Sequence, residues 1–375
     1  MFDFPISGVM VNPLLLVFLG FTAGMVGGFI GIGGGYMVTP ALIVFGFPGY
    51  MASGIDMTHI SGTSIISTVR HRQLGNIDWT IALSMVAGTM FGVELGVRLL
   101  GYFKTIGLSS VAVLVASLVI MVSLFIYTNM ETRKSHKALE QAAREGKDAG
   151  REEVSGGASR FVQSIPLAPI VRCRNAGVVI SMWMIVLVGM FTGVLAGFLG
   201  VGGGFVRVPA LVYLVGASTH IAVGTDLVEI AFSGAYGTLR HSIEGNVDFL
   251  AVMFMLCGAV VGAQFGAIST AFVRGPAIRY ILSYSLMLAA LGALFPLLDT
   301  LTGQSIPLLA TLAVTLTLGQ MIFLCTFILA MLAFALLARR GMWVPSWAVP
   351  LLVKPAPPST IRRPLRAKAE ERGTL

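Results

Sequence analysis

Long apolar stretches without charge constrain this chain more than any other feature. Fifteen of its 42 charged residues lie in residues 131–175 and ten lie in residues 339–375, which leaves only 17 for the other 293 residues. The apolar stretches between them are long enough to cross a bilayer core about 30 Å thick. Charged residues make up 11% of the chain, against roughly a quarter in soluble domains. The sequence therefore predicts an integral membrane protein and excludes a soluble enzyme, a secreted domain and a nucleic-acid-binding protein.

Apolar segments separated by glycine, proline and charge predict an all-α polytopic membrane protein. Two short segments, residues 36–47 and 205–216, have only 12 residues each, whereas a membrane span needs about 20. We interpret them as half-helices or re-entrant segments, which must be buried in protein or line a cavity. Full-length segments are expected at about 13–30, 52–69, 79–101, 107–128, 178–199, 221–239, 249–270, 277–297 and 306–338.

Matching glycine runs precede the two short segments and reveal an internal repeat. Residues 31–35 and 200–204 both read Gly-x-Gly-Gly-Gly, and Pro-Ala-Leu begins five residues after the last glycine of each run. The copies are offset by 169 residues, and by 170 after one inserted residue. At the second offset, Gly-Asn-[Ile/Val]-Asp recurs at residues 75–78 and 245–248. We infer an ancient duplication.

The repeat and the charged stretches predict the domain organisation and the orientation. Residues 131–175 carry nine basic and six acidic residues, and the tail carries eight basic and two acidic ones. Basic residues mark cytoplasmic loops, so the linker and the C-terminus are predicted to be cytoplasmic. The first half makes an odd number of crossings, either three or five, which places the N-terminus outside. The predicted divisions are a first transmembrane repeat at 1–130, a charged cytoplasmic linker at 131–176, a second repeat at 177–298, an additional C-terminal helix at 299–338 and a basic tail at 339–375.

This orientation makes the two repeats inverted. Inverted repeats with broken or re-entrant helices are the architecture of secondary transporters, in which the substrate binds near the middle of the bilayer. The glycine runs, the Pro-Ala-Leu segments and the Gly-Asn-[Ile/Val]-Asp turns resemble those of the sulfite exporter TauE/SafE (TSUP) family. The resemblance implies an inner-membrane transporter of small anions such as sulfite, sulfoacetate and related organosulfur or organic acids, with no ATPase of its own.

The glycine runs themselves are candidates for anion binding. A glycine run before a short helix exposes backbone N–H groups and a positive helix end, so the predicted substrate-binding residues include Gly33, Gly34, Gly35, Gly202, Gly203 and Gly204. The alternative is that these glycines only permit close crossing of broken helices. A dinucleotide-binding loop is excluded, because the required strand and ribose-binding acid are missing. Glycines spaced by four elsewhere in the chain predict packing stripes on helices.

Five ionisable residues in apolar segments are candidates for function, because such groups are expensive at membrane depth. Asp56 corresponds to Asp226 through the repeat and His59 corresponds to Glu229, each three residues after its aspartate and on the same helical face. These pairs could carry a coupling proton or hold a coupling cation, or the aspartates could only cap helices. Arg207, three residues after the second glycine run, could bind an oxyanion or snorkel to the interface.

Hydroxyl side chains extend the predicted substrate site. Ser61, Ser64 and Thr225 lie near the ionisable pairs in sequence and could hydrogen-bond an oxyanion, although hydroxyls in membrane helices often bond to their own backbone. Other polar residues are predicted to be structural. Asp78 and Asp248 are expected to cap helices, and Glu94 and Arg98 are expected to form an i,i+4 ion pair.

The sequence thus predicts a secondary transporter that moves a small anion by alternating access in the cell inner membrane. Its expected partners are the anion, the lipid bilayer and a coupling proton or cation, with no nucleic acid, cofactor or metal. The alternative is a non-transporting scaffold or sensor that recruits a partner through the 131–176 linker. An intramembrane enzyme is disfavoured, because no nucleophile and base have a recognised spacing.

Overall fold

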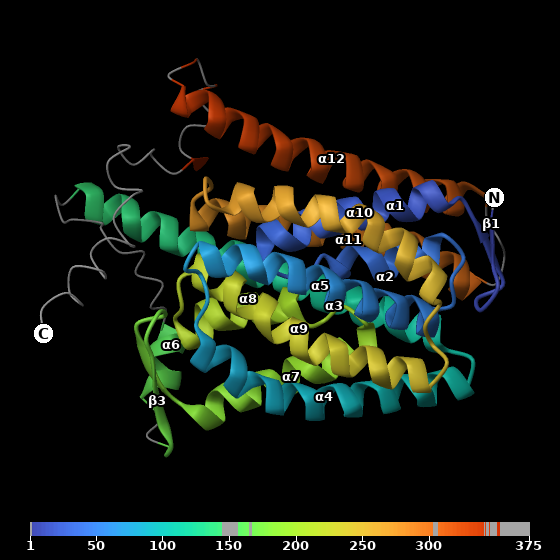
Figure 1. Ribbon diagram of the computed structural model, residues 1–375, viewed down its shortest axis with the longest axis horizontal. Helices are drawn as coiled ribbons and strands as arrows, with labels where there is room; N and C mark the ends of the chain where they lie inside the picture. Colours follow the sequence, from blue (N-terminus) through green and yellow to red (C-terminus); the bar gives the residue numbers. More distant parts are fainter. Residues whose placement is uncertain are drawn as a thin grey trace, which may run out of the picture.

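The structure is a computed structural model that describes residues 2–144, 157–164, 167–302 and 307–340, together with residues 342, 345, 351 and 352. It is a bundle of long helices with a small β-hairpin at each end (Figure 1). The first half contains β1 Phe2–Phe4, β2 Val9–Val11, α1 Pro13–Ile30, α2 Gly35–Val44, α3 Gly49–Gln73, α4 Trp79–Thr105 and α5 Ser109–Arg144. The remainder contains α6 Gly157–Gln163, β3 Ile170–Cys173, β4 Val178–Ser181, α7 Met182–Leu199, α8 Gly204–Ala210, the π-helical turn η1 Leu211–Val215, α9 Thr219–Ile243, α10 Phe249–Thr270, α11 Gly275–Thr302 and α12 Pro307–Arg339.

The prediction of an all-α polytopic membrane protein is confirmed. Within the described residues, seven helices are long and apolar enough to cross a membrane: α1, α4, α5, α7, α10, α11 and α12. Two further helices, α3 and α9, have 25 residues each but carry more polar side chains. The short predicted segments form α2 and the consecutive α8 and η1. The chain is therefore a multi-pass membrane protein.

Several predicted boundaries differ from the structure. The predicted start of a membrane segment at residue 178 is wrong. Residues 178–181 form β4, which pairs with β3, and α7 begins at Met182. A β-branched Val-Val-Ile run after the positive-φ Gly177 favours a strand over a helix here. Helix α5 continues past the predicted boundary at 130 as far as Arg144, as the helix-compatible start of the linker allows. Residues 145–156 of that linker and most of the basic tail lie outside the described residues.

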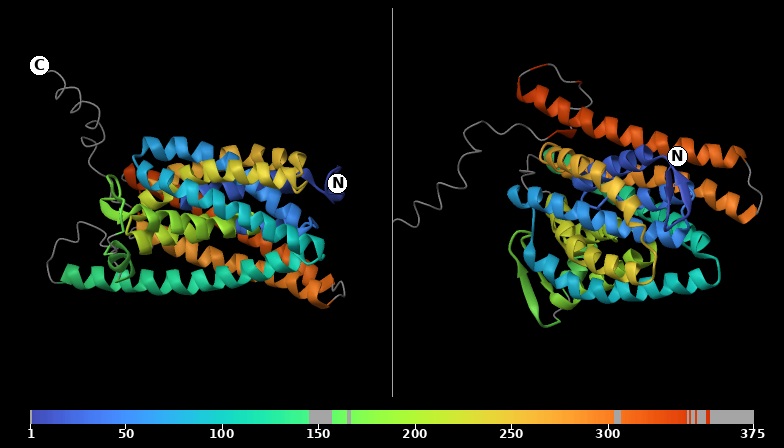
Figure 2. Two further views of the ribbon diagram at one scale, coloured as in Figure 1. Left: turned by 90° about the horizontal axis from the view of Figure 1, so that it is seen from below. Right: turned by 45° about the vertical axis from the view of Figure 1, so that its right-hand side comes forward.

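In each half, the short segment brings the chain back to the end of the bundle at which the preceding long helix began. Phe4 in β1 packs against Phe47 just before α3, with ring centroids 6.1 Å apart, so α1 and α3 both begin at the β1 end. The chain therefore enters through α1 and comes back through α2. In the second half, Gly224 near the start of α9 lies against Asn76, in the turn that follows α3. Helices α7 and α9 accordingly both begin at the β3 end (Figures 1 and 2).

A contact between a helix cap and the hairpin of the opposite half occurs twice, once in each direction between the two halves. Asp248 caps α10 and accepts a hydrogen bond from Ser7 N in the first hairpin, at 3.2 Å. Asp78 caps α4 and accepts one from Ala176 N in the second hairpin, at 3.0 Å. The predicted capping roles of both aspartates are thereby confirmed. Each cap also anchors the hairpin of the opposite half, and the sequence predicted neither hairpin.

Glycine stripes pack two helix pairs together, which confirms their predicted packing role, and both pairs join the two halves. A Cβ on Gly20 of α1 would lie 1.9 Å from the Met255 carbonyl oxygen of α10, and one on Gly193 of α7 would lie 2.4 Å from the Thr89 oxygen of α4. Such distances leave no room for a side chain, so the helices meet backbone to backbone. The stripe residues are Gly20, Gly24 and Gly28 against Gly258, Gly262 and Gly266, and Gly88, Gly92 and Gly96 against Gly189, Gly193 and Gly197.

An ion-pair network links α4 to α9. Glu94 pairs with Arg98 at 2.7 Å, which confirms the predicted i,i+4 contact. The same carboxylate also accepts a 2.5 Å bond from Arg240 Nε and a 3.0 Å bond from the Tyr236 hydroxyl, both on α9. The sequence did not predict this interhelical link, because nothing in the spacing brings α4 beside α9.

Candidate functional site

The two glycine turns, residues 31–35 and 200–204, meet at the centre of the bundle. Helix α1 ends and α2 begins within the first turn, and α7 ends and α8 begins within the second. A Cβ on Gly35 would lie 3.0 Å from Val201 Cα, and one on Gly204 would lie 2.8 Å from Ile32 Cα. All residues of both turns are buried. The predicted glycine site is thus one place built from both halves.

Positive φ angles explain why each turn needs glycine. Gly33 and Gly34 have φ of 70° and 79°, and Gly202 and Gly203 have φ of 66° and 72°, values that residues with a Cβ adopt at a cost. The turns reverse the chain inside the bundle, so α2 and α8 both begin among buried residues. No described side chain caps these two helix starts, so the helix ends retain their positive partial charge.

Asp56 and Asp226 lie against the turns in equivalent positions. A Cβ on Gly35 would lie 3.0 Å from Asp56 Oδ2, and one on Gly204 would lie 2.6 Å from Asp226 Oδ2. Both side chains are completely buried, and neither caps a helix. The capping alternative for this pair is therefore wrong.

The second half holds a buried cluster of three charged side chains. Arg207 Nη1 donates to Asp226 Oδ1 at 3.0 Å and also to Glu229 Oε2. Its Nε donates to the Thr192 hydroxyl oxygen at 3.1 Å. Arg207 is completely buried, so the interfacial, snorkelling alternative is wrong. A guanidinium at this depth needs counter-charges, and Asp226 and Glu229 provide them.

The first half holds a different set at the equivalent place. Val38 replaces the arginine, and Asp56 Oδ2 instead lies 2.8 Å from the Thr39 hydroxyl. His59 is completely buried, and its Nδ1 lies 4.0 Å from Asp56 Oδ1, beyond hydrogen-bonding distance. The centre therefore combines a carboxylate beside a hydroxyl in one half with a guanidinium between two carboxylates in the other.

Several buried polar atoms at the centre have no hydrogen-bond partner among the described residues. They are Arg207 Nη2, Asp56 Oδ1, Asp226 Oδ2, Glu229 Oε1, the Ser64 hydroxyl and both ring nitrogens of His59. Buried polar groups in proteins are almost always hydrogen-bonded, and exceptions indicate water, an ion or a functional role. Their concentration beside the glycine turns leaves this centre with hydrogen-bonding capacity that its own described side chains do not use.

The structure separates the predicted hydroxyls. Ser64 lies toward the first turn, with its Oγ 3.8 Å from where a Cβ on Gly33 would be. Ser61 instead lies against Gly234 of α9. The Thr225 hydroxyl accepts a 2.9 Å bond from Asp78 N and so supports the start of α4. Of the three predicted hydroxyls, only Ser64 is placed beside a glycine turn.

Sequence reasoning missed two central residues, Thr39 and Thr192. Both are completely buried or nearly so, and each bonds the central charged residue of its own half, Asp56 or Arg207. Only Thr39 had a usable signal, because a polar residue beside Pro40 in a short apolar segment stands out, whereas Thr192 lies within the full-length α7. The repeat concealed them, because their counterparts at an offset of 169 are Val208 and Ala23.

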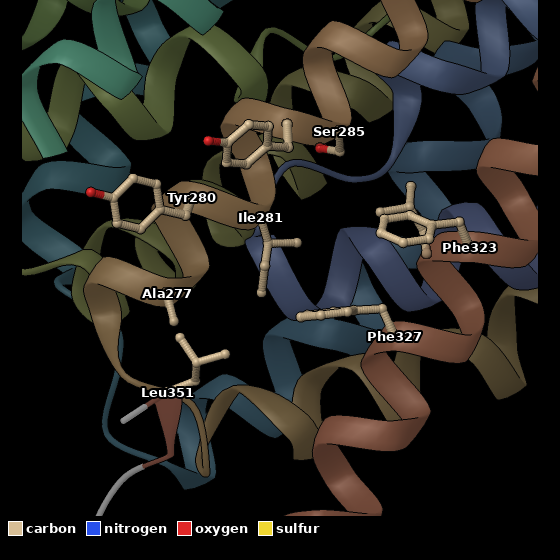
Figure 3. Close-up of a pocket in the computed structure, with 9 residues that line it drawn as sticks. Ala277, Tyr280, Ile281, Ser285, Phe323, Phe327 and Leu351 are labelled. Carbon is tan, nitrogen blue, oxygen red and sulfur yellow. The ribbon is translucent and has the colours of Figure 1, made fainter. Parts of the chain in front are cut away.

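An apolar cavity of about 210 Å³ lies elsewhere, between α11 and α12 (Figure 3). Tyr280 and Ile281 of α11 face Phe323 and Phe327 of α12 across it, and Leu351 lies at its edge. None of the described residues that line this cavity is charged, so they offer an anion no counter-charge. Among the described residues, no group of three or more His, Cys, Asp and Glu could hold a metal ion.

Comparisons with known proteins support a membrane transporter. The chain is 27% identical over 262 residues to the probable membrane transporter protein YunE of Bacillus subtilis (strain 168), covering 68% of this chain and 87% of that protein. It is 26% identical over 266 residues to the probable membrane transporter protein MJ0441 of Methanocaldococcus jannaschii, covering 67% and 82%. No solved structure matches the chain. The sequence model described as sulfite exporter TauE/SafE matches residues 16–293, and the chain belongs to this family of membrane transporters.

Proposed function

We propose that the chain is a secondary transporter of a small anion, such as sulfite, sulfoacetate or a related organosulfur or organic acid. The observation that carries the proposal is the free Nη2 of Arg207, a fully buried guanidinium nitrogen with no partner among the described residues. It lies 3.1 Å from where a Cβ on Gly203 would be. An oxyanion there would meet both a guanidinium N–H and the start of α8. Ser64, which lies beside the first glycine turn, would supply a further donor.

We further propose alternating access of two inverted repeats. Helices α3 and α9 are equivalent and pack antiparallel, with Gly54 near the start of α3 against Asn246 after the end of α9. Equivalent helices that run in opposite directions can open the same centre to either side of the membrane. In the structure the charged residues of the centre are buried, which fits a state closed to both sides. Family membership favours this function over the scaffold alternative.

The proposed function is tested with purified protein in detergent and in proteoliposomes. Labelled sulfite and sulfoacetate are the first probes for flux, and a thermal-shift panel of sulfur oxyanions and short carboxylates tests binding. Saturable uptake of at least one probe, with a matching rise in Tm, is the expected result. Uptake no greater than in protein-free liposomes for every probe would contradict the proposal.

Replacing Ser64 by alanine is expected to weaken anion binding about 5- to 10-fold, the value of one hydrogen bond of about 1 kcal/mol. The Tm without ligand should not fall, because the Ser64 hydroxyl has no partner among the described residues. Titration of the thermal shift with sulfoacetate measures the affinity. Ser123→Ala, which removes an exposed hydroxyl on α5, is the control and should bind like the wild type. An unchanged affinity in Ser64→Ala would remove Ser64 from the site.

The proposed orientation is tested by labelling single cysteines in a variant that lacks Cys173, Cys257 and Cys325. A cysteine at position 8, in the exposed turn of the first hairpin, should react with an impermeant maleimide on intact cells. A cysteine at position 174, in the exposed turn of the second hairpin, should react only after the membrane is opened. The reverse pattern would place the 131–176 linker and the C-terminus outside.

A further inference from the structure

The Thr39 hydroxyl has two oxygen neighbours and only one proton. Its Oγ1 lies 2.8 Å from Asp56 Oδ2 and 3.1 Å from the Leu199 carbonyl oxygen. A carbonyl accepts only, an ionised carboxylate accepts only, and a hydroxyl donates one hydrogen. With Asp56 ionised, the single hydroxyl hydrogen has to serve both acceptors, so neither receives a full hydrogen bond. This mismatch lies among three buried residues, where incomplete hydrogen bonds are costly.

A proton on Asp56 removes this mismatch. In the structure, Thr39 Oγ1 is the donor to both oxygens. With Asp56 protonated, the acid would instead donate from Oδ2 to Thr39 Oγ1, and the Thr39 hydroxyl would donate to the Leu199 carbonyl at the end of α7 alone. Every contact in this chain then contains one hydrogen. These hydrogen bonds also join α3 and α2 of the first half to α7 of the second. The protonation state of Asp56 therefore affects a contact between the repeats.

Asp226, the equivalent acid of the second half, has different hydrogen-bond partners from Asp56. Asp226 is held by Arg207 Nη1 at 3.0 Å, and Glu229 bonds the same nitrogen. The position equivalent to Thr39 is Val208, which offers no hydroxyl. Asp226 therefore has a permanent counter-charge, whereas the basic group nearest to Asp56 is the His59 ring, whose Nδ1 lies 4.0 Å from Asp56 Oδ1.

The charges around the centre favour binding of a proton together with the anion. The ionisable side chains of the centre are His59 beside Asp56 on α3, and Arg207, Asp226 and Glu229 beyond the glycine turns; α2 carries Tyr36, whereas α1 and α7 carry no ionisable side chain. Three ionised carboxylates and one guanidinium would leave two net negative charges in the bilayer interior. An anion beside Arg207 Nη2 adds to that excess, and buried unpaired charge is strongly unfavourable.

We propose that Asp56 is the proton-binding residue of the transporter and that one proton bound there accompanies each anion. The inference rests on the proposed anion transport and names its coupling ion. The proton reaches Asp56 from the side at which the anion enters and leaves to the other side with it. Because binding free energies are reciprocal, the anion favours protonation of Asp56 and the proton favours anion binding.

The first experiment measures sulfoacetate binding between pH 5.5 and 8.5, a range in which the charge of the probe stays constant. For the wild type, the Kd should rise about tenfold per pH unit above the midpoint, as the loss of one coupled proton requires. Asp56→Asn, a neutral residue of the same shape, should give a pH-independent Kd close to the low-pH value of the wild type. Asp3→Asn, an exposed change in β1, is the matched control and should keep the wild-type profile. A profile for Asp56→Asn as steep as that of the wild type would overturn the proposal.

A second variant tests the proposal without removing the carboxyl group, through the direction in which the pH midpoint of binding shifts. Thr39→Val deletes the hydroxyl with little change of volume. If Thr39 accepts a hydrogen bond from neutral Asp56, its loss disfavours the protonated form and moves the pH midpoint of binding down by about one unit. If Thr39 instead stabilises the ionised form, the midpoint moves up. A shift to higher pH, or no shift, overturns the proposal.

Proteoliposomes separate the failure of this inference from the failure of the transport function. With the pH dye pyranine trapped inside, sulfoacetate added outside should acidify the lumen at a rate that matches labelled uptake. Uptake without acidification would overturn proton coupling and leave anion transport standing. Absence of both uptake and binding for every anion probe would overturn the proposed function, and this inference would fall with it.

Discussion

Replacing Arg207 by methionine is expected to lower the free energy of unfolding by about 3–5 kcal/mol, the usual result of removing one partner from a buried ion pair. The change leaves Asp226 and Glu229 buried without the guanidinium that bonds both of them. It also removes the free Nη2 to which the anion is proposed to bind. A large fall in Tm in detergent and loss of the sulfoacetate-dependent Tm shift are the expected readouts.

A triple variant distinguishes the structural from the binding role of Arg207. Arg207→Met combined with Asp226→Asn and Glu229→Gln removes the unpaired charges and should recover most of the lost stability, because neutral side chains avoid the desolvation cost. It should not recover anion binding. Arg98→Met is the control, since this arginine pairs with Glu94 but its side chain is 71% exposed, and exposed pairs contribute about 0–1 kcal/mol. Full anion affinity in the triple variant would show that the guanidinium takes no part in binding.

Gly20→Ala is expected to destabilise the bundle by about 3 kcal/mol, at the upper end of the usual range for overpacking. The added Cβ would lie 1.9 Å from the Met255 carbonyl oxygen and 2.7 Å from its Cα. Backbone atoms of a packed helix cannot move aside as the end of a side chain can, so α1 and α10 must separate along the whole stripe. Thermal unfolding in detergent measures the effect.

Gly101→Ala is the matched control for Gly20→Ala. Gly101 also lies within a helix, α4, but a Cβ there would have nothing within 4 Å. Alanine should then stabilise the protein by up to about 1 kcal/mol through its higher helix propensity. Alanine is thus expected to lower the stability of the protein at position 20 and to raise it at position 101. Equal Tm values for both variants would refute the assignment of Gly20 to a helix contact.

Much of the fold could be predicted because the bilayer limits which backbone structures can span it and because the sequence contains an internal repeat. Apolar runs free of charge can only be helices or barrel strands in a bilayer, and the expected spans at 13–30 and 249–270 coincide with α1 and α10. The glycine repeat located the two interrupted segments. The hairpin β3–β4 could not be predicted, because a short apolar run such as residues 178–181 has the same composition as the start of a span.

The candidate site could be predicted only in part. Duplication located Asp56 and Asp226, since both copies keep an aspartate at the same place. The contacts of Arg207 with Asp226 and Glu229 join residues that are 19 and 22 positions apart, and no helical spacing connects them. Thr39 escaped notice because a lone threonine in an apolar helix usually bonds to its own backbone.

By itself the sequence determined that this protein is a duplicated membrane bundle and that its interior retains a few ionisable groups. Composition and repeat spacing are properties of the chain alone, so they needed no coordinates. Only the tertiary structure decided what those groups contact. It placed Arg207 between two carboxylates and left Asp56 with Thr39, because helix packing brings together side chains that sequence distance keeps apart.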